Sequence, residues 1–389
     1  MFKRAILLFL SIPAAGLLLA CAPAEIVRQT PLPSPTAQAQ TTAELADTPT
    51  VEIPTVPPVP TDTPAPPTAT PTPTPTPTLI PTPTFTPSPT STVTPTPTSD
   101  PYAGLTITDL SARSYGGGQL EIEEVMAVTD AFTRTLVRYP SEGLTLYGFM
   151  NIPQGDGPFP VALMMHGYIP PEQYNTIAYT TRYADSLARA GYLVIHPNYR
   201  NYPPSDEGPD LFRVAQAVDA LNLIAVIKAQ AGQPGPLAKA DPTFIGMVGH
   251  SMGGGITLRT LTLTSDVKAA VLYGAMSGDE QRNYEKIQQW SGGARGLEEL
   301  NTPPEALQRI SPINFLERIS AAVSIHHGDN DGTVPPAWSA ELCQQLQALN
   351  KPVECFSYPG QPHTFQGEAD QLFMQRVVEF FNRYKGNQE

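Results

Sequence analysis

The chain contains the stretch Gly249-His250-Ser251-Met252-Gly253-Gly254, which follows the apolar run 244–248 and precedes a helical pattern from 256 to 263. An apolar strand, a G-x-S-x-G turn and a helix in this order are typical of a nucleophile elbow. In such a turn the serine takes a strained backbone conformation, and side chains beside it collide with the adjacent strand and helix. Ser251 is therefore a candidate nucleophile. The alternative is a glycine-rich turn with a buried serine.

A serine nucleophile needs a general base, because a free hydroxyl is a poor nucleophile. In the arrangement that goes with this elbow, the base is a histidine that comes last in the chain, after the acid. The chain has six histidines, and only His363 leaves room beyond Ser251 for an acid and a further element. It lies in a turn-rich loop after a predicted strand at 353–358. We expect His250 to pack beneath the elbow, and His326 and His327 to be strand residues, one facing the core and the other a helix.

The acid is expected on the loop after the preceding strand, which we place at 322–327. Two aspartates lie in this loop, Asp329 and Asp331. We choose Asp331 because it stands shortly before Pro335, where the chain must turn back into a helix. Asp329 is the runner-up and is a good turn-former. In this interpretation Asp331 orients the His363 imidazole and stabilises its charged form.

An acyl-transfer site also needs two N–H donors for the developing oxyanion. Met252, directly after the nucleophile, provides one from the start of the helix. The strand at 161–166 ends in Gly167-Tyr168, and we assign the Tyr168 N–H as the second donor. The Tyr168 ring is also a candidate substrate contact, with an exposed loop aromatic as the alternative.

Further segments make the chain resemble the catalytic domain of the prolyl oligopeptidase family of serine peptidases, and also dienelactone-hydrolase-like enzymes, within the α/β-hydrolase superfamily. The matching segments cover about residues 140 to 385 and include Gly157-Pro158-Phe159-Pro160, Pro197-Asn198-Tyr199-Arg200, Ser311-Pro312, Asp331-Gly332-Thr333-Val334-Pro335 and Tyr358-Pro359. The resemblance implies the same assignment of Ser251, Asp331 and His363, and a peptide substrate. The peptidases of this group usually carry an upstream β-propeller, whereas this chain has no blade-like repeats there. A carboxylesterase that acts on small or polymeric esters is therefore the rival interpretation.

Strands alternate with helices along residues 101–389, which predicts one α/β-hydrolase domain with a mostly parallel twisted sheet and helices on both faces. Residues 105–138 are mixed, and 121–127 fits either a strand or the start of a helix. Residues 277–318 interrupt the alternation and are expected to form a small cap over the site. Trp290 and Tyr284 of this cap and Trp338 are candidate substrate contacts. Trp290 is equally consistent with an anchor between cap and core.

The N-terminal residues have the pattern of a bacterial lipoprotein. A basic start and an apolar segment at 1–20 predict a signal peptide, and Leu18-Leu19-Ala20-Cys21 resembles a lipobox. Cys21 is then the lipidation site, and an ordinary signal peptide with an incidental cysteine is the alternative. Residues 21–100 hold many of the chain's 45 prolines, mostly in Thr-Pro repeats, and predict a disordered stalk. We therefore expect a lipid-anchored protein on the extracytoplasmic side of a bacterial membrane.

The remaining composition narrows the partners. The formal net charge is −13, which predicts no nucleic-acid partner. Cys343 and Cys355 lie at similar distances from a turn, so they are expected to form a disulfide, with two buried thiols as the alternative. No Cys/His spacing fits a zinc site, and we expect neither metal nor cofactor. The sequence thus predicts a surface-tethered serine hydrolase for peptides or esters, with a non-catalytic stalked binding protein as the alternative.

Overall fold

The computed structural model describes residues 100–386. The predictions for residues 1–20, for Cys21 and for most of the stalk lie outside these residues. The strands of the described part are β1 (Glu121–Val128), β2 (Phe132–Ser141), β3 (Leu144–Pro153), β4 (Phe159–Met165), β5 (Leu193–Pro197), β6 (Ala240–His250), β7 (Val267–Tyr273), β8 (Ala322–Gly328) and β9 (Val353–Tyr358). The helices are α1 (Ile107–Ser111), α2 (Thr181–Arg189), α3 (Val214–Gln230), α4 (Met252–Leu263), α5 (Glu280–Trp290), α6 (Leu297–Leu300), α7 (Pro304–Ile310), α8 (Pro336–Ala348) and α9 (Gly367–Lys385), with 3₁₀ turns η1 (Pro171–Gln173), η2 (Leu211–Arg213) and η3 (Pro312–Arg318).

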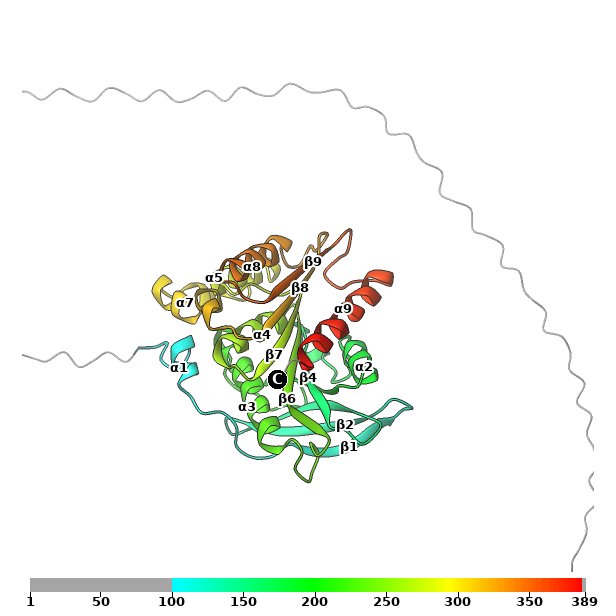
Figure 1. Ribbon diagram of the computed structural model, residues 1–389. Helices are drawn as coiled ribbons and strands as arrows, with labels where there is room; N and C mark the ends of the chain where they lie inside the picture. Colours follow the sequence, from blue (N-terminus) through cyan, green and yellow to red (C-terminus); the bar gives the residue numbers. More distant parts are fainter. Residues whose placement is uncertain (1–99, 387–389) are drawn as a thin grey trace, which may run out of the picture. The chain divides into compact units, whose positions relative to one another are not determined.

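These strands form a single sheet in the order β1-β2-β3-β5-β4-β6-β7-β8-β9. The pairings from β5 to β9 are all parallel, whereas β1, β2, β3 and β5 pair in antiparallel fashion. Parallel strands need long crossover connections, and helices provide them here. In Figure 1 the helices lie on both sides of the sheet, with α2 and α9 together on one side and α3, α4 and α8 on the other. The predicted α/β-hydrolase architecture is therefore confirmed.

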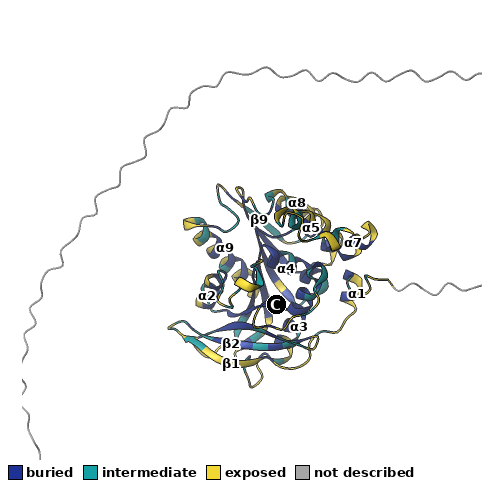
Figure 2. Ribbon diagram, turned by 180° about the vertical axis from the view of Figure 1, so that it is seen from behind, coloured by how far each residue is buried: buried dark blue, intermediate teal, exposed yellow. Residues whose placement is uncertain are grey.

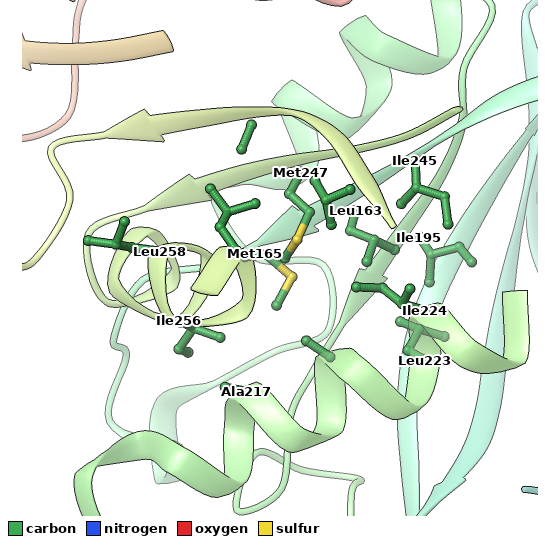
Figure 3. Close-up of a cluster of buried hydrophobic side chains, with 14 of the residues drawn as sticks. Leu163, Met165, Ile195, Ala217, Leu223, Ile224, Ile245, Met247, Ile256 and Leu258 are labelled. Atoms are coloured by element: carbon green, nitrogen blue, oxygen red, sulfur yellow. The ribbon is translucent and has the colours of Figure 1, made fainter. Parts of the chain in front are cut away.

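The two faces of the sheet bury different side chains. On β4, Leu163 and Met165 point to the face covered by α3 and α4, while Met164 points to the face covered by α2 and α9. Figure 3 shows Leu163 and Met165 packed with Met247 of β6 against the helices. Because both faces are covered, these strands are apolar throughout instead of alternating, as expected for a buried parallel sheet.

In the N-terminal part of the described chain, the structure decides between the two alternatives that the sequence leaves open. Residues 105–138 form α1, the edge strand β1 and most of β2, so the ambiguous segment 121–127 is a strand. Nearly all of β1 is exposed or half-buried, as its colours in Figure 2 show. An edge strand that buries little has no marked alternation of apolar residues, and this explains why its sequence does not distinguish it from a helix.

Two local features, the insertion after β7 and a disulfide, lie near the candidate active site. Residues 277–318 hold α5, α6, α7 and η3, which follow β7 in place of a single crossover helix. A disulfide joins Cys343 of α8 to Cys355 of β9, and it ties together the two elements that flank the loops after β8 and β9. Within residues 100–386, no helix has the length and apolar character needed to cross a membrane.

Candidate active site

Ser251 stands at a strained turn between β6 and α4. Its φ is 56° and its ψ is −117°, a combination that residues other than glycine rarely adopt. The turn is held because the Ser251 N–H donates to Tyr273 O at 2.9 Å, and the Ser251 carbonyl accepts from the Met276 N–H at 3.0 Å. The side chain is raised into a pocket and not into the core.

The glycines beside Ser251 are required by close contacts of the backbone. A Cβ on Gly249 would lie 2.4 Å from the carbonyl oxygen of Gly253, and a Cβ on Gly253 would lie 2.2 Å from the carbonyl oxygen of Met165. Both distances are far below van der Waals contact, so only glycine fits at either position. The G-x-S-x-G pattern thus reflects the packing of β4, β6 and α4 around the elbow.

Asp331 lies on the loop between β8 and α8 and its side chain is fully buried. Its Oδ1 accepts the N–H groups of Thr333 at 2.8 Å and Val334 at 2.9 Å. Its Oδ2 lies 2.7 Å from Nδ1 of His363 and 2.9 Å from Nε2 of His327. Burial by itself raises the pKa of Asp331, but the hydrogen bonds from His327 and His363 and the backbone outweigh it. The pKa therefore lies well below its usual range, and the carboxylate is charged.

His363 lies on the loop after β9, as predicted, and its ring is held from two sides. Nδ1 of His363 faces Asp331. The backbone carbonyl oxygen of His363 lies 3.0 Å from Nε2 of His250. The His250 and His363 rings lie 4.7 Å apart, centroid to centroid. Burial lowers the pKa of His250 to about 3, so this neighbour is neutral. His250 packs under the elbow and the His363 loop and supports both.

Ser251 and His363 line the same pocket, which has a volume of about 1280 Å³. Among the hydrogen bonds of residues 100–386, none joins the Ser251 hydroxyl to the imidazole of His363. Hydrogen bonds of this kind are often long without substrate and shorten in the reacting complex. The structure thus brings Asp331 and His363 into contact and places Ser251 in the same pocket as His363.

The two predicted oxyanion donors also reach this pocket. Met252 is the first residue of α4, where N–H groups have no partner inside the helix. Tyr168 follows Gly167, and a Cβ on Gly167 would lie 3.1 Å from Cβ of Ser251, so this loop packs directly beside Ser251. The Tyr168 ring is 46% exposed, and its hydroxyl is bonded by Arg295 of the cap. Tyr168 therefore lies at the junction of the loop, the pocket and the cap.

The aromatic candidates separate into two places. Trp290 lines the pocket with Ser251 and is 44% exposed, and Tyr284 lines it while almost fully buried. Trp338 lines a different cavity of about 180 Å³, beside Met276 and Ile313, and it packs against the main core. It stands on the third position of α8 and is not among the residues that line the pocket of Ser251. Its role as a substrate contact stays a prediction.

The site contains supporting residues that the sequence does not mark. The Tyr179 hydroxyl lies 2.5 Å from Nδ1 of His250 and accepts the Gly167 N–H at 3.1 Å. It lies in a loop without any motif, so no local pattern could identify it. His327 lies on a strand and contacts Ser339 of α8, in line with the expectation that one of the paired histidines faces a helix. Its contact with Asp331 depends on the path of the loop between them and could not be read from spacing.

Comparison with known proteins agrees with the motifs. Residues 209–388, slightly under half of the chain, match the family model described as the prolyl oligopeptidase family. The match begins before α3 and includes all of α9, and the fold and family resemblance inferred from the motifs is confirmed. The family match and the similar solved structures support a serine hydrolase.

Proteins similar to this chain are described both as esterases and as peptidases. A Synechocystis sp. protein described as a carboxymethylenebutenolidase is 22% identical over 59% of this chain and 85% of its own length. The acylaminoacyl peptidase of Pyrococcus horikoshii is 22% identical with a TM-score of 0.52, over 67% of this chain. The Pyrococcus furiosus esterase Pf2001 is 18% identical with a TM-score of 0.52, over 70% of this chain. The chain spans 43% of the peptidase and 99% of the esterase. These likenesses show a shared fold.

Proposed function

We propose that Ser251, His363 and Asp331 form the catalytic triad of this hydrolase, and that its substrates are carboxylic esters. The observation that carries the proposal is the strained serine in the pocket of an imidazole whose other nitrogen is bonded to a buried carboxylate. Strain of this kind persists where surrounding structure enforces it, and it is concentrated at functional sites.

In the proposed reaction, the Ser251 oxygen attacks the acyl carbon while Nε2 of His363 takes the hydroxyl proton. The C–O bond to the leaving group then breaks, and His363 returns the proton to the departing oxygen. A water molecule attacks the acyl-enzyme, His363 takes its proton, and the acid product leaves as the proton passes back to Ser251. The Met252 and Tyr168 N–H groups are the proposed donors to the oxyanion. Asp331 stabilises the imidazolium at each stage.

Two observations favour esters as the first substrate class. The chain spans nearly the full length of the Pf2001 esterase but under half of the acylaminoacyl peptidase. The pocket is also wide, at about 1280 Å³, and has apolar side chains such as Trp290 and Leu297 on its wall. Peptides are the second candidate class, because the family match itself favours them.

A labelling experiment with a substrate comparison tests this proposal. Residues 100–389 and the full chain should react with a fluorophosphonate probe, and Ser251→Ala should abolish the labelling. Labelling that persists in Ser251→Ala would identify a different nucleophile. A parallel panel of p-nitrophenyl esters and chromogenic peptides should show faster turnover of esters. Preference for peptides would reverse the order of the two classes and leave the triad untouched.

We also propose that Cys21 carries a lipid anchor and that residues 21–100 act as a stalk on the cell surface. The apolar segment that ends at Cys21 and the Thr-Pro repeats support this proposal. Cys21→Ser should move the protein from the membrane fraction to the soluble fraction in a bacterial host that processes lipoproteins. Ser34→Ala, within the same N-terminal region, is the matched control and should leave it in the membrane fraction. Membrane association of Cys21→Ser would point to another anchor.

A further inference from the structure

One carboxylate oxygen in the site faces two histidines. Oδ2 of Asp331 lies 2.7 Å from Nδ1 of His363 and 2.9 Å from Nε2 of His327. The triad uses the first of these contacts and has no role for the second. His327 belongs to β8, is 4% exposed, and reaches Asp331 across four positions of the chain.

The neighbours of His327 fix where its protons are. Nε2 faces two acceptors, Oδ2 of Asp331 and, at 3.1 Å, the carbonyl oxygen of Val334. An acceptor cannot bond another acceptor, so Nε2 carries a proton and donates it. Nδ1 lies 2.6 Å from the Ser339 hydroxyl, which is able to donate to it. A neutral ring thus satisfies every contact, with Ser339 as donor to Nδ1 and Asp331 as acceptor from Nε2.

The hydrogen bond from His327 fixes the position of Oδ2 of Asp331, the oxygen that contacts the proposed base His363. The backbone N–H groups of Thr333 and Val334 hold Oδ1 only. Without His327, Oδ2 would have His363 as its single hydrogen-bonding neighbour in residues 100–386, and His363 lies on a loop. The His327 ring is clamped between that carboxylate and α8, so it provides a rigid second attachment.

The same bond also moderates the field at His363. A proton donated to Oδ2 withdraws negative charge from the oxygen that stabilises the His363 imidazolium. Within residues 100–386, the titratable groups in direct contact with the His363 ring are Asp331 and His250, and burial keeps His250 neutral with a pKa of about 3. Asp331 is therefore the charged neighbour through which His327 acts on the base.

We propose that His327 is a positioning residue, which donates its Nε2 proton to Oδ2 of Asp331 and thereby fixes and tunes the His363 base. This inference rests on the proposed function of Ser251, Asp331 and His363. His327 itself touches no reacting atom.

The rate of fluorophosphonate labelling of Ser251 as a function of pH tests the proposal without knowledge of the substrate. His327→Phe removes the donor at similar ring size. The plateau rate should fall by about tenfold to a hundredfold, as expected when a catalytic group is displaced by about 1 Å or less. The acid limb of the profile should move to higher pH, because an unshared carboxylate holds the proton on His363 more tightly. His327→Gln restores an N–H donor near the position of Nε2 and should bring both features back toward wild type.

His326→Phe is the matched control. His326 is the adjacent residue on β8, is fully buried, and bonds Ser324 and Tyr358 instead of Asp331. It should keep the wild-type acid limb, even if its stability to urea falls. If His327→Phe does not fold, His327→Asn carries the test, because its shorter amide lies near the position of Nδ1 and leaves Oδ2 of Asp331 without this donor. The acid limb should then shift in the same direction.

An acid limb that is unchanged in His327→Phe, or in His327→Asn where that variant carries the test, overturns the proposal and leaves His327 a structural residue. A lowered plateau without a shift has the same meaning. The failure of the proposed function looks different: wild-type protein would then show no labelling at Ser251 at any pH. The two hypotheses are thus separated by the wild-type profile alone.

Discussion

The two sides of the pocket differ in how firmly their side chains are held. We define the floor as Ser251, Asp331 and His363, and the wall as the pocket-lining residues of 290–299 in the cap. On the floor, Ser251 and Asp331 are 9% and 8% exposed, and Asp331 alone receives four hydrogen bonds. On the wall, Trp290 and Leu297 are 44% and 56% exposed.

The difference separates two tasks within one pocket. In the proposed triad each group must keep its position within a fraction of an ångström. The ends of β6, β8 and β9, and the contacts around them, hold the floor residues in place. Apolar wall residues only need to offer surface to the substrate. We therefore expect changes on the floor to alter turnover for every substrate, and changes on the wall to alter the choice among substrates.

The largest effect is expected from Asp331→Asn. The new side-chain amide would replace a carboxylate that accepts from two imidazoles, and His363 would then lose the partner that fixes its tautomer. Turnover should fall by roughly 10⁴-fold, the effect of the same change in the serine protease triad. Initial rates on the best p-nitrophenyl ester give the measurement.

Asp329→Asn is the control for this change. Asp329 lies two positions away in the same loop, is exposed, and accepts the Gly360 N–H at 2.5 Å. Its turnover should stay within a few-fold of wild type. If Asp329→Asn proves the more damaging of the two, the acid of the triad has been assigned to the wrong residue.

Local rules allow the sequence to predict the floor residues. A strained turn needs Gly249 and Gly253, and the chain order of acid and base then leaves few candidates. His363 is the one histidine with room before it, and the loop before Pro335 offers only two acids. The structure places the chosen acid against His363 and leaves Asp329 bonded to the backbone.

Other parts of the molecule could not be read from the sequence, for physical reasons. Which cavity Trp338 lines depends on how α8 is rotated about its axis, and a single aromatic near a helix start does not fix this. Tyr179 supports His250 from a loop with no motif. The edge strand β1 buries little, so it lacks the alternation of buried and exposed residues that is typical of a half-buried strand. Long-range packing decides each of these features.

Acid should weaken the sheet that carries the floor. Four histidines on or directly after β4, β5, β6 and β8 are neutral because burial lowers their pKa. The pKa is about 4 for His166, well below 6.5 for His196, and about 3 for both His250 and His326. Below pH 6.5 the four imidazoles bind protons in the unfolded chain, whereas in the folded chain they stay neutral. The contribution of these four histidines to stability is therefore complete above pH 6.5, and it is lost as pH falls from 6.5 toward their folded-state pKa values of about 4 and about 3.

One group acts in the opposite sense. Burial raises the pKa of Asp210 from 3.8 to about 7. Between these two pH values the folded chain keeps a proton on this carboxyl, whereas the unfolded chain has released it. With four histidines against this one carboxyl, unfolding near pH 5.5 takes up about three protons net, at about 1.4 kcal/mol for each proton and pH unit. Urea unfolding at pH 7.5, 6.5 and 5.5 measures the slope. His326→Phe should reduce it by about one proton, and equal stability at all three values would contradict the assignment of neutral buried rings.

The smallest effect is expected on the wall. Trp290→Ala removes an exposed aromatic surface from the pocket while every floor contact stays in place. Loss of an aromatic contact costs about 1.4 kcal/mol, so kcat/KM should fall about tenfold for esters with a bulky acyl group. Acetyl esters, which are too short to reach the wall, should be hydrolysed at the wild-type rate. The comparison of acetyl with long-chain esters is therefore the decisive measurement.

Leu372→Ala provides the reference for this change. Leu372 is 40% exposed on α9, outside the residues that line the pocket, so its removal should affect neither class of ester. If Trp290→Ala slows acetyl and long-chain esters equally, Trp290 acts on the floor and the division between a fixed floor and a selective wall is wrong. If it slows neither, Trp290 anchors the cap to the rest of the domain, and its removal should then lower the urea midpoint instead. The ratio of the two rates and the urea midpoint thus assign Trp290 to one of its three roles.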